Sequence, residues 1–200
     1  MQRLNNLTYS KLAVAMDKRQ CRFFDEGDYN LNIIGIRAAE RRADQFDDLI
    51  CVAFQQSNAR HLFKFPATVD PGKKWLLNPM TEKGTAIVAP GQYIGLWQLG
   101  MHRGQYEALV QRRPISVYRD NDRDDELDLD PVDLDHGYFG INLHRASELR
   151  LAENVGAYSA GCQVIQHAAD YDLLMALCRR AVADYGNIFT YTLLDESELW

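Results

Sequence analysis

The chain has 200 residues, of which 46% are hydrophobic and 25% charged, and its formal net charge at neutral pH is −6. These are values of an ordinary globular protein, so they exclude the disordered, collagenous and membrane-spanning classes. A chain of this length buries about 70% of its unfolded surface and needs no cross-link to fold. Its basic residues are scattered, which argues against a nucleic-acid partner, because phosphate binding requires a basic face.

The N-terminal region predicts a helix and no targeting segment. Leu4, Leu7, Leu12, Ala15 and Met16 recur at helical spacing, which predicts an amphipathic helix over residues 5–18. Polar residues interrupt every apolar stretch there, so we expect neither a signal peptide nor a membrane span. We therefore expect a protein that is cytoplasmic as synthesised and that reaches any substrate elsewhere only after release or delivery.

Short β-rich runs dominate the chain after this helix. Pro-Gly and Asn-Pro pairs at 71–72, 78–79 and 90–91 predict turns between some of them. The predicted strands cover residues 31–37, 49–54, 61–68, 84–89, 93–100, 106–111, 115–119 and 138–144. Apolar residues recurring between Ala169 and Ala181 then predict a second helix that ends near Gly186, followed by a strand at 188–194. This pattern predicts a mainly β protein with helices (α+β), built as a β-sandwich or partly closed barrel.

The four cysteines show no C-x-x-C spacing, so we expect reduced thiols at 21, 51, 162 and 178. Cys51 and Cys178 lie in apolar patterns and are expected to be buried packing residues. Cys162 differs, because it follows Ser159, Ala160 and Gly161 at the predicted start of a helix. A helix N-terminus lowers the pKa of a thiol and makes it a better nucleophile.

A nucleophilic cysteine needs a base, and histidine has the pKa for that role near neutrality. In papain-like enzymes the histidine lies far downstream of the cysteine, whereas only His167 follows Cys162 here. His144 ends the run "YFGINLH", eighteen residues before Cys162, and we prefer it as the base. We expect His61, His102, His136 and His167 to be surface or loop histidines.

The stretch "NLHRASELRLAENVGAYSAGCQVI" resembles the signature of the L,D-transpeptidase (YkuD-like) catalytic domain. That signature is a strand-ending His-Gly, a loop, and Ser-His-Gly-Cys-x-Arg leading into a helix. His144, Ser159, Gly161 and Cys162 stand on the matching positions. The upstream run "GTAIVAPGQYIGLW" is similar to the family's strand pair before the signature. The resemblance implies an L,D-transpeptidase-like catalytic domain over residues 59–200, with residues 1–58 as a helical and strand extension packed on it.

The resemblance also implies a chemistry. Cys162 would attack a carbonyl of a peptidoglycan stem peptide, His144 would accept the thiol proton, and a thioester would form. Backbone N–H groups of Gly161 and Cys162 would hold the oxyanion. Water as the acceptor gives an L,D-carboxypeptidase, and a second stem amine gives an L,D-transpeptidase. The expected partners are stem peptides or muropeptides, and the catalysis requires no cofactor.

Three positions depart from the family pattern: Arg145 replaces Gly, Ala160 replaces His, and Val164 replaces the Arg that follows the cysteine. Because that arginine shapes the family's substrate site, we expect Arg145 or Arg150 to supply the positive charge instead. Asn142 lies two residues before His144 on the predicted strand and shares its face. It either supports the site or is an inward-facing structural residue.

An acidic segment over residues 120–130 has the spacing of a calcium loop. Its candidate ligands at loop positions 1, 3, 5, 7 and 9 are Asp120, Asp122, Asp124, the carbonyl of Glu126, and Asp128. Asp125 stands where such loops have Gly, and Pro131 where they have a bidentate Glu. A structural Ca²⁺ and a solvated turn both remain open interpretations.

We therefore predict a cysteine-dependent enzyme of peptidoglycan peptide acyl transfer or hydrolysis. Two settings fit: trimming of recycled muropeptides in the cytoplasm, and a lytic role of the phage or secreted type. The alternative is a non-catalytic, calcium-stabilised binding or structural module on the same fold.

Overall fold

A computed structural model describes residues 6–132 and 134–200. Its helices are α1 (Tyr9–Lys18), α2 (Lys73–Leu77) and α3 (Ala168–Tyr185), and a 3-10 turn, η2 (Glu196–Leu199), lies near the C-terminus. The strands are β1 (Asn32–Arg37), β2 (Asp48–Gln56), β3 (Ala59–Thr68), β4 (Thr85–Val88), β5 (Gly91–His102), β6 (Tyr106–Gln111), β7 (Ile115–Asp120), β8 (Asp135–Gly137), β9 (Leu143–Arg145), β10 (Gln163–Ile165) and β11 (Phe189–Asp195). The fold is mainly β with helices, as the sequence predicts.

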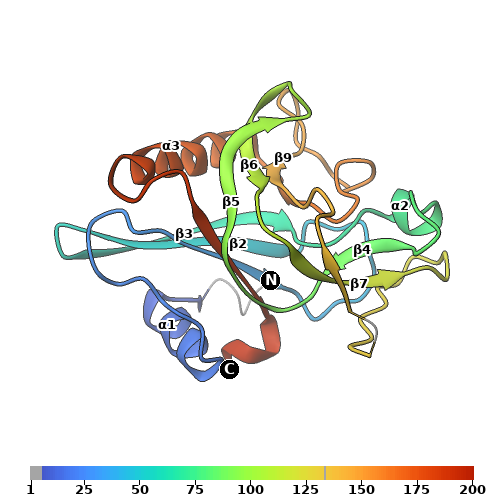
Figure 1. Cartoon of the computed structure of the whole chain (residues 1–200), viewed down its shortest axis with the longest axis horizontal. Coiled ribbons are helices and arrows are strands. Elements are labelled where there is room, and N and C mark those ends of the chain that lie inside the picture. The colour runs from blue at the N-terminus through green and yellow to red at the C-terminus, as the bar shows by residue number, and fades with distance from the viewer. Residues whose placement is uncertain (1–5, 133) are drawn as a thin grey trace.

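Eight strands form a closed barrel in the order β1-β11-β5-β6-β9-β10-β3-β2. Two of its neighbouring pairs, β1 with β11 and β9 with β10, are parallel, and the others are antiparallel. A separate sheet of β4, β7 and β8 lies beside the barrel (Figure 1). The parallel pair β9–β10 matters most for the site, because it requires the chain to return over residues 146–162 before it can pair again.

The barrel interior and the face of α3 share one hydrophobic core. Buried residues on α3 include Tyr171, Leu174 and Cys178, and they belong to the same cluster as Leu143 and Ile165 of β9 and β10. In Figure 1, α3 lies on the opposite side of the barrel from α1. The helix ends as predicted, at Gly186, which has φ +78° and caps the last turn with its N–H.

The helix α1 covers the outside of the barrel next to β1 and β2. Leu12 and Met16 pack there against Ile34 and Cys51 in a second apolar cluster. The hydroxyl of Thr8 accepts a hydrogen bond from the Lys11 N–H at 3.3 Å, which starts the helix at Tyr9. Leu4 and the predicted first residue of the helix, residue 5, lie outside the described residues.

Strands β1 and β2 are part of the barrel wall between β11 and β3. The boundary predicted between residues 58 and 59 lies in the tight β2–β3 hairpin, where Gln56 pairs with Ala59. Ser57 and Asn58 form that turn with φ of +49° and +64°. The structure therefore joins residues 32–56 to the rest of the barrel, since removing these two strands would open the wall.

Of the strand predicted at 138–144, only the last two residues lie in an observed strand, which is β9. Before it, the side chain of Gln111 replaces strand pairing: its Oε1 accepts hydrogen bonds from the N–H groups of Phe139 at 3.1 Å and Ile141 at 2.8 Å. No sequence pattern predicts β8 and β10, each of which has three residues. Strands this short carry almost no periodic signal.

Candidate active site

The parallel pairing of β9 and β10 brings the two halves of the sequence signature side by side. Leu143 pairs with Gln163, and His144 pairs with Val164. Leu143 lies in the core of the barrel, so alternation along the strands turns His144 and Val164 to the outside. Cys162 packs in the same apolar cluster as Val164, and it is therefore a diagonal neighbour of His144 on that outer side.

A tight turn over residues 159–162 sets the backbone of Cys162. The buried Ser159 accepts a hydrogen bond from the Gly161 N–H at 3.1 Å and donates one to the Cys162 carbonyl at 2.7 Å. Gly161 has φ +121°, and a Cβ there would overlap the carbonyl oxygen of Ala86. Only glycine fits this position, which explains the Ser-x-Gly-Cys pattern in physical terms.

The residue after the thiol is also anchored, but inside the barrel. The Gln163 side chain donates hydrogen bonds to the carbonyls of Val69 and Gly161, both at 3.2 Å, and accepts one from the Tyr191 hydroxyl at 2.5 Å. Tyr191 lies on β11, on another part of the barrel wall. Cys162 is thus held between a turn on one side and a buried polar anchor on the other.

The prediction that Cys162 opens a helix is wrong. The strand β10 follows the thiol directly, and α3 begins only at Ala168. The strand β10 completes the barrel by pairing with β9 through all three of its residues and with β3 through Val164 and Ile165. This pairing extends the chain where the sequence pattern predicts helix. No helix dipole therefore acts on the thiol. Burial raises the pKa of Cys162, and a backbone hydrogen bond with Asn142 and the charge of Arg103 offset this only in part.

The Cys162 thiol bonds to a backbone carbonyl rather than to His144. Its Sγ donates a hydrogen bond to the Gly140 carbonyl at 3.3 Å, and within the described residues no hydrogen bond joins Cys162 to His144. The predicted oxyanion role of the Gly161 N–H also fails, because this N–H already donates to Ser159. Among the described residues no acceptor is found for the Cys162 N–H. This N–H is therefore the backbone donor beside the thiol that remains for an oxyanion.

His144 is held as a neutral base with one free nitrogen. Its Nδ1 lies 2.8 Å from the Arg145 carbonyl, and since a carbonyl only accepts, this contact assigns the ring proton to Nδ1. The Tyr106 hydroxyl lies 3.3 Å from the same nitrogen. Nε2 is buried and has no hydrogen-bond partner in the described part of the chain. Burial and the neighbouring His102 lower the pKa of His144 to about 3, so the ring is neutral at pH 7.

His102 belongs to this site, although the sequence analysis expected a surface or loop residue. It is buried at the end of β5, and its ring stacks on His144 with the centroids 4.1 Å apart. The predicted Asn142 orients it, since the Asn142 amide nitrogen lies 3.2 Å from His102 Nδ1. The amide oxygen of Asn142 accepts from the Gln111 N–H at 2.8 Å. No local pattern marks His102, because the β5–β6 hairpin brings it to β9 from 42 residues away.

A cavity of about 620 Å³ opens on the His144 side of the turn. It carries both signs of charge along with aromatic and imidazole rings. Its lining residues are His102, Arg103, Gln105, Tyr106, His144, Arg145, Ala146, Glu148, Ala157 and Tyr158. A second cavity of about 230 Å³ is lined by Trp75, Ala86, Phe139 and Ala160, among others. Tyr158 lines the first cavity and Ala160 the second, so the segment that leads into Cys162 borders both.

The two predicted cations lie in different places. Arg145 lines the larger cavity, where its guanidinium lies over the Tyr106 ring at 4.3 Å and pairs with Glu148 at 2.8 Å. Arg150 is exposed and lines a neighbouring cavity beyond Tyr158 instead. Arg103, which the sequence analysis did not consider, is a second cation of the larger cavity.

Val164 explains why an arginine does not follow the thiol here. Its side chain is fully buried in an apolar cluster with Phe46, Ala152 and Val155. A guanidinium at this position would lose its hydration without gaining a partner, which is strongly unfavourable.

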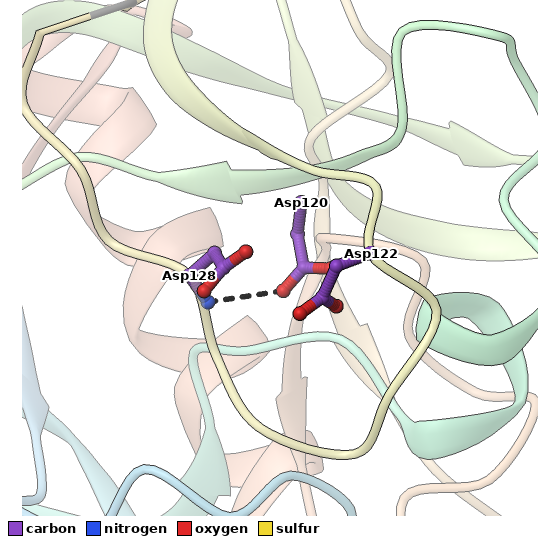
Figure 2. A group of neighbouring side chains, drawn as sticks. All are labelled: Asp120, Asp122 and Asp128. Atoms are coloured by element: carbon purple, nitrogen blue, oxygen red, sulfur yellow. Dashed lines mark hydrogen bonds between the residues drawn. The ribbon is translucent and has the colours of Figure 1, made fainter.

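The predicted calcium ligands lie in the loop after β7. Asp120, Asp122 and Asp128 bring their carboxylate oxygens within 4.8 Å of one another (Figure 2). Asp124 and Glu126 are not in that group. The Asp124 carboxylate instead accepts a hydrogen bond from the Glu126 N–H at 2.7 Å, within a local turn.

The other histidines lie outside the site. His61 stacks on Phe54, His136 is exposed and lies 3.1 Å from the Ser116 hydroxyl, and His167 is exposed just before α3.

Within residues 6–132 and 134–200, no helix combines the length and the apolar character that crossing a membrane requires. Comparisons with protein-family models, curated proteins and solved structures find no match to this chain.

Proposed function

We propose that this chain is a cysteine-dependent acyltransferase or hydrolase of peptidoglycan stem peptides, on an L,D-transpeptidase-like fold. The observation that carries the proposal is the parallel pairing of β9 and β10, which sets a thiol and a buried imidazole on one side of the barrel wall. The imidazole is neutral, and its free nitrogen has no partner in the described part of the chain. Such a nitrogen is ready to accept a proton.

The first chemical step moves the thiol proton. The Cys162 side chain turns from the Gly140 carbonyl toward His144, and Nε2 takes the proton as sulfur attacks the substrate carbonyl. A carbon–sulfur bond forms, the carbon–nitrogen bond of the peptide breaks, and the protonated His144 returns its proton to the leaving amine. The Arg145 carbonyl keeps the Nδ1 proton in place throughout, so the ring presents the same nitrogen in both steps.

The resting site disfavours a thiolate–imidazolium pair. The pKa of the thiol is raised and that of His144 is lowered, so both groups are neutral before substrate binds. Proton transfer therefore accompanies the attack itself, which is general-base catalysis rather than attack by a preformed thiolate. The Cys162 N–H is the donor for the negative charge that develops on the carbonyl oxygen.

The charges of the larger cavity suit a peptide with free ionised ends. Arg103 is available for a stem-peptide carboxylate. Arg145 and Glu148 pair with each other at 2.8 Å, and a bound peptide would exchange that pair for contacts of Arg145 with its carboxylate and of Glu148 with its ammonium group. Water as the acceptor of the thioester gives carboxypeptidase activity, and a stem-peptide amine gives transpeptidation. Both settings, muropeptide recycling and wall lysis after delivery, use the same site.

The test is mass spectrometry of purified tetrapeptide muropeptides after incubation with the protein. We expect loss of the terminal D-residue or a new cross-linked dimer, and a thioester adduct on Cys162 in acid-quenched samples. Cys162→Ala should abolish the product, and His144→Ala should slow its formation about a hundredfold or more, the usual scale of a general base. Cys21→Ala is the matched control, because this partly exposed thiol lies outside the site. Turnover that persists in Cys162→Ala would refute the mechanism, and binding without turnover in the wild type would favour the non-catalytic alternative.

A further inference from the structure

The loop that follows β7 gathers three carboxylates at one point. Asp120 ends the strand, and Asp122 and Asp128 come from the two sides of the loop, so that their oxygens lie within 4.8 Å of one another. Figure 2 shows the three side chains directed at a common space. A hydrogen bond of 3.0 Å from the Asp128 N–H to Asp120 Oδ2 closes the loop across its base.

The buried member of the cluster has an oxygen with no donor. Asp120 is fully buried, and its Oδ1 has no hydrogen-bond partner among the residues that the structure describes. In Figure 2 this second oxygen lies on the side of Asp120 that faces Asp122. A buried carboxylate oxygen without a donor is strongly unfavourable unless a cation or a proton meets it.

Two basic side chains near the loop pair with carboxylates outside the cluster. Arg119 pairs with Asp135 at 3.0 Å, and Lys73 pairs with Asp125 at 2.9 Å. No ion pair found over residues 6–132 and 134–200 includes a carboxylate of the cluster. The described part of the chain thus concentrates negative charge here without neutralising it.

We propose that Asp120, Asp122 and Asp128 bind one calcium ion. Calcium takes oxygen ligands at about 2.3–2.6 Å, so two oxygens on opposite sides of the ion lie about 5 Å apart. The observed separations fit within that span. Water and carbonyl oxygens of the loop complete the coordination, as is usual for calcium in flexible loops.

Two of the five ligands suggested by the sequence are not part of this site. The Asp124 carboxylate accepts from the Glu126 N–H, so it forms the turn that brings Asp128 back toward Asp120. The site is therefore made by loop positions 1, 3 and 9, rather than by the alternating ladder of a calcium loop that leads into a helix. Position 12, Pro131, has no carboxylate to offer, and this geometry does not require one.

The ion would fix the conformation of a loop that contacts a segment distant in the sequence, residues 41–43. The Leu127 N–H donates to the Arg41 carbonyl at 2.9 Å, and the Ala43 N–H donates to the Asp125 carbonyl at 3.0 Å. The buried Leu127 packs with Ala43, Leu76 and Ile87 in an apolar cluster. Calcium bound between Asp120 and Asp128 would hold Leu127 in that cluster, so it stabilises the fold and takes no part in the proposed acyl transfer.

The experiment is calcium titration of the metal-stripped full-length protein by isothermal titration calorimetry, with magnesium in a parallel titration and melting temperature as a second readout. We expect one calcium site, weaker binding of magnesium, and a melting temperature that rises with calcium. The double variant Asp122→Asn with Asp128→Asn should weaken calcium binding at least tenfold. Both positions are exposed, and asparagine at 122 keeps the acceptor for the Asp124 N–H, so the variant is expected to fold.

Asp124→Asn and Asp130→Asn are the matched controls, since each removes one negative charge from the same loop and keeps its local hydrogen-bond acceptor. Both should bind calcium within about twofold of wild type. Absence of calcium binding at millimolar concentration in the wild type would overturn the proposal. An equal loss in Asp124→Asn would overturn the assignment of these three ligands. Muropeptide turnover is measured separately, so failure of either proposal leaves the other distinguishable.

Discussion

His102 stacks on His144 with the ring centroids 4.1 Å apart and the ring planes 26° apart. The first lies at the end of β5 and the second on β9, and the strand between them in the barrel is β6. Two imidazoles this close cannot both carry a proton without strong repulsion, so His102 adds to burial in lowering the pKa of His144. Burial and this neighbour together keep the free nitrogen of His144 unprotonated over a wide range of pH.

Replacing His102 by phenylalanine tests that coupling. His102→Phe keeps a flat ring over His144 but removes its positive form, so the pKa of His144 should rise. The acidic limb of the kcat/KM profile for muropeptide turnover should then move to higher pH. His61→Phe is the matched control, because His61 also stacks on an aromatic ring, at Phe54, outside the site. An unmoved acidic limb in His102→Phe would show that the stack does not tune the base.

Replacing Arg145 should weaken substrate binding much more than replacing Arg150. A charge-assisted hydrogen bond contributes about 1.5–3 kcal/mol, which corresponds to roughly a tenfold to hundredfold change in affinity. Arg145→Ala should therefore raise KM for a stem peptide at least tenfold, while Arg145→Lys should recover part of the loss. Arg150→Ala should change KM by less than about twofold, because its side chain lines a different cavity. Equal effects of the two alanine variants would place the carboxylate elsewhere.

The buried His144 should make the folded state sensitive to acid. Its pKa is about 3 in the folded state, whereas an unfolded histidine has a pKa near 6.5. Below pH 6.5 the unfolded state thus binds a proton that the folded state does not, and the free energy of unfolding falls as the pH falls. Between pH 8 and pH 5 this contributes about 2 kcal/mol of lost stability.

Urea unfolding of wild type and His144→Gln at several pH values measures that contribution, since other titrating groups cancel in the difference. We expect the stability of His144→Gln to fall less between pH 8 and pH 5, by about 2 kcal/mol. His167→Gln, at an exposed position, should follow the wild type. If the free energy of unfolding depended on pH in the same way for wild type and His144→Gln, the buried ring would take up its proton at no cost in stability.

Gly161→Ala should destabilise the turn before the thiol. The backbone conformation at φ +121° is strained for any other residue, by about 1–3 kcal/mol, and the added Cβ would also overlap the Ala86 carbonyl. Gly104→Ala separates the two effects, because Gly104 has φ +70° and no heavy atom within 4 Å of the position that a Cβ would occupy. Thermal or urea unfolding should show about 1 kcal/mol lost in Gly104→Ala and clearly more in Gly161→Ala. Equal losses would mean that the Ala86 overlap relaxes freely.

Much of the architecture follows from local patterns. The strand runs at 31–37, 61–68 and 106–111 and the apolar stripe of α3 lie where the sequence predicts them, within a few residues. The Ser-x-Gly-Cys turn is also a local feature, since the hydroxyl of Ser159 bonds to Gly161 and Cys162. Burial of alternate or helically spaced apolar residues needs no knowledge of the distant chain, which is why these predictions succeed.

Other features depend on which strands become neighbours. The pattern after Cys162 predicts helix, yet the strand β10 pairs with both β9 and β3, because closing the barrel satisfies backbone groups that a longer helix would leave open at the wall. Asp124 and Asp128 both stand at ligand positions of a calcium loop in the sequence. Only the folded loop shows that Asp124 forms a turn with Glu126, whereas Asp128 joins the carboxylate cluster.

The sequence by itself determined the mainly β fold, the position of the thiol behind a glycine turn, and the place of His144 on a strand. Only the tertiary structure decided that His144 is a neutral base with a free Nε2, that His102 lies against it, and that the thiol has no helix dipole beside it. The physical reason is how far apart along the chain the interacting groups lie. Turn geometry, strand periodicity and the carbonyl contact that sets the His144 tautomer arise from neighbours in the chain. The burial of His144 and the His102 stack, which lower the pKa of His144, arise instead from groups that barrel closure brings from about 40 or more residues away.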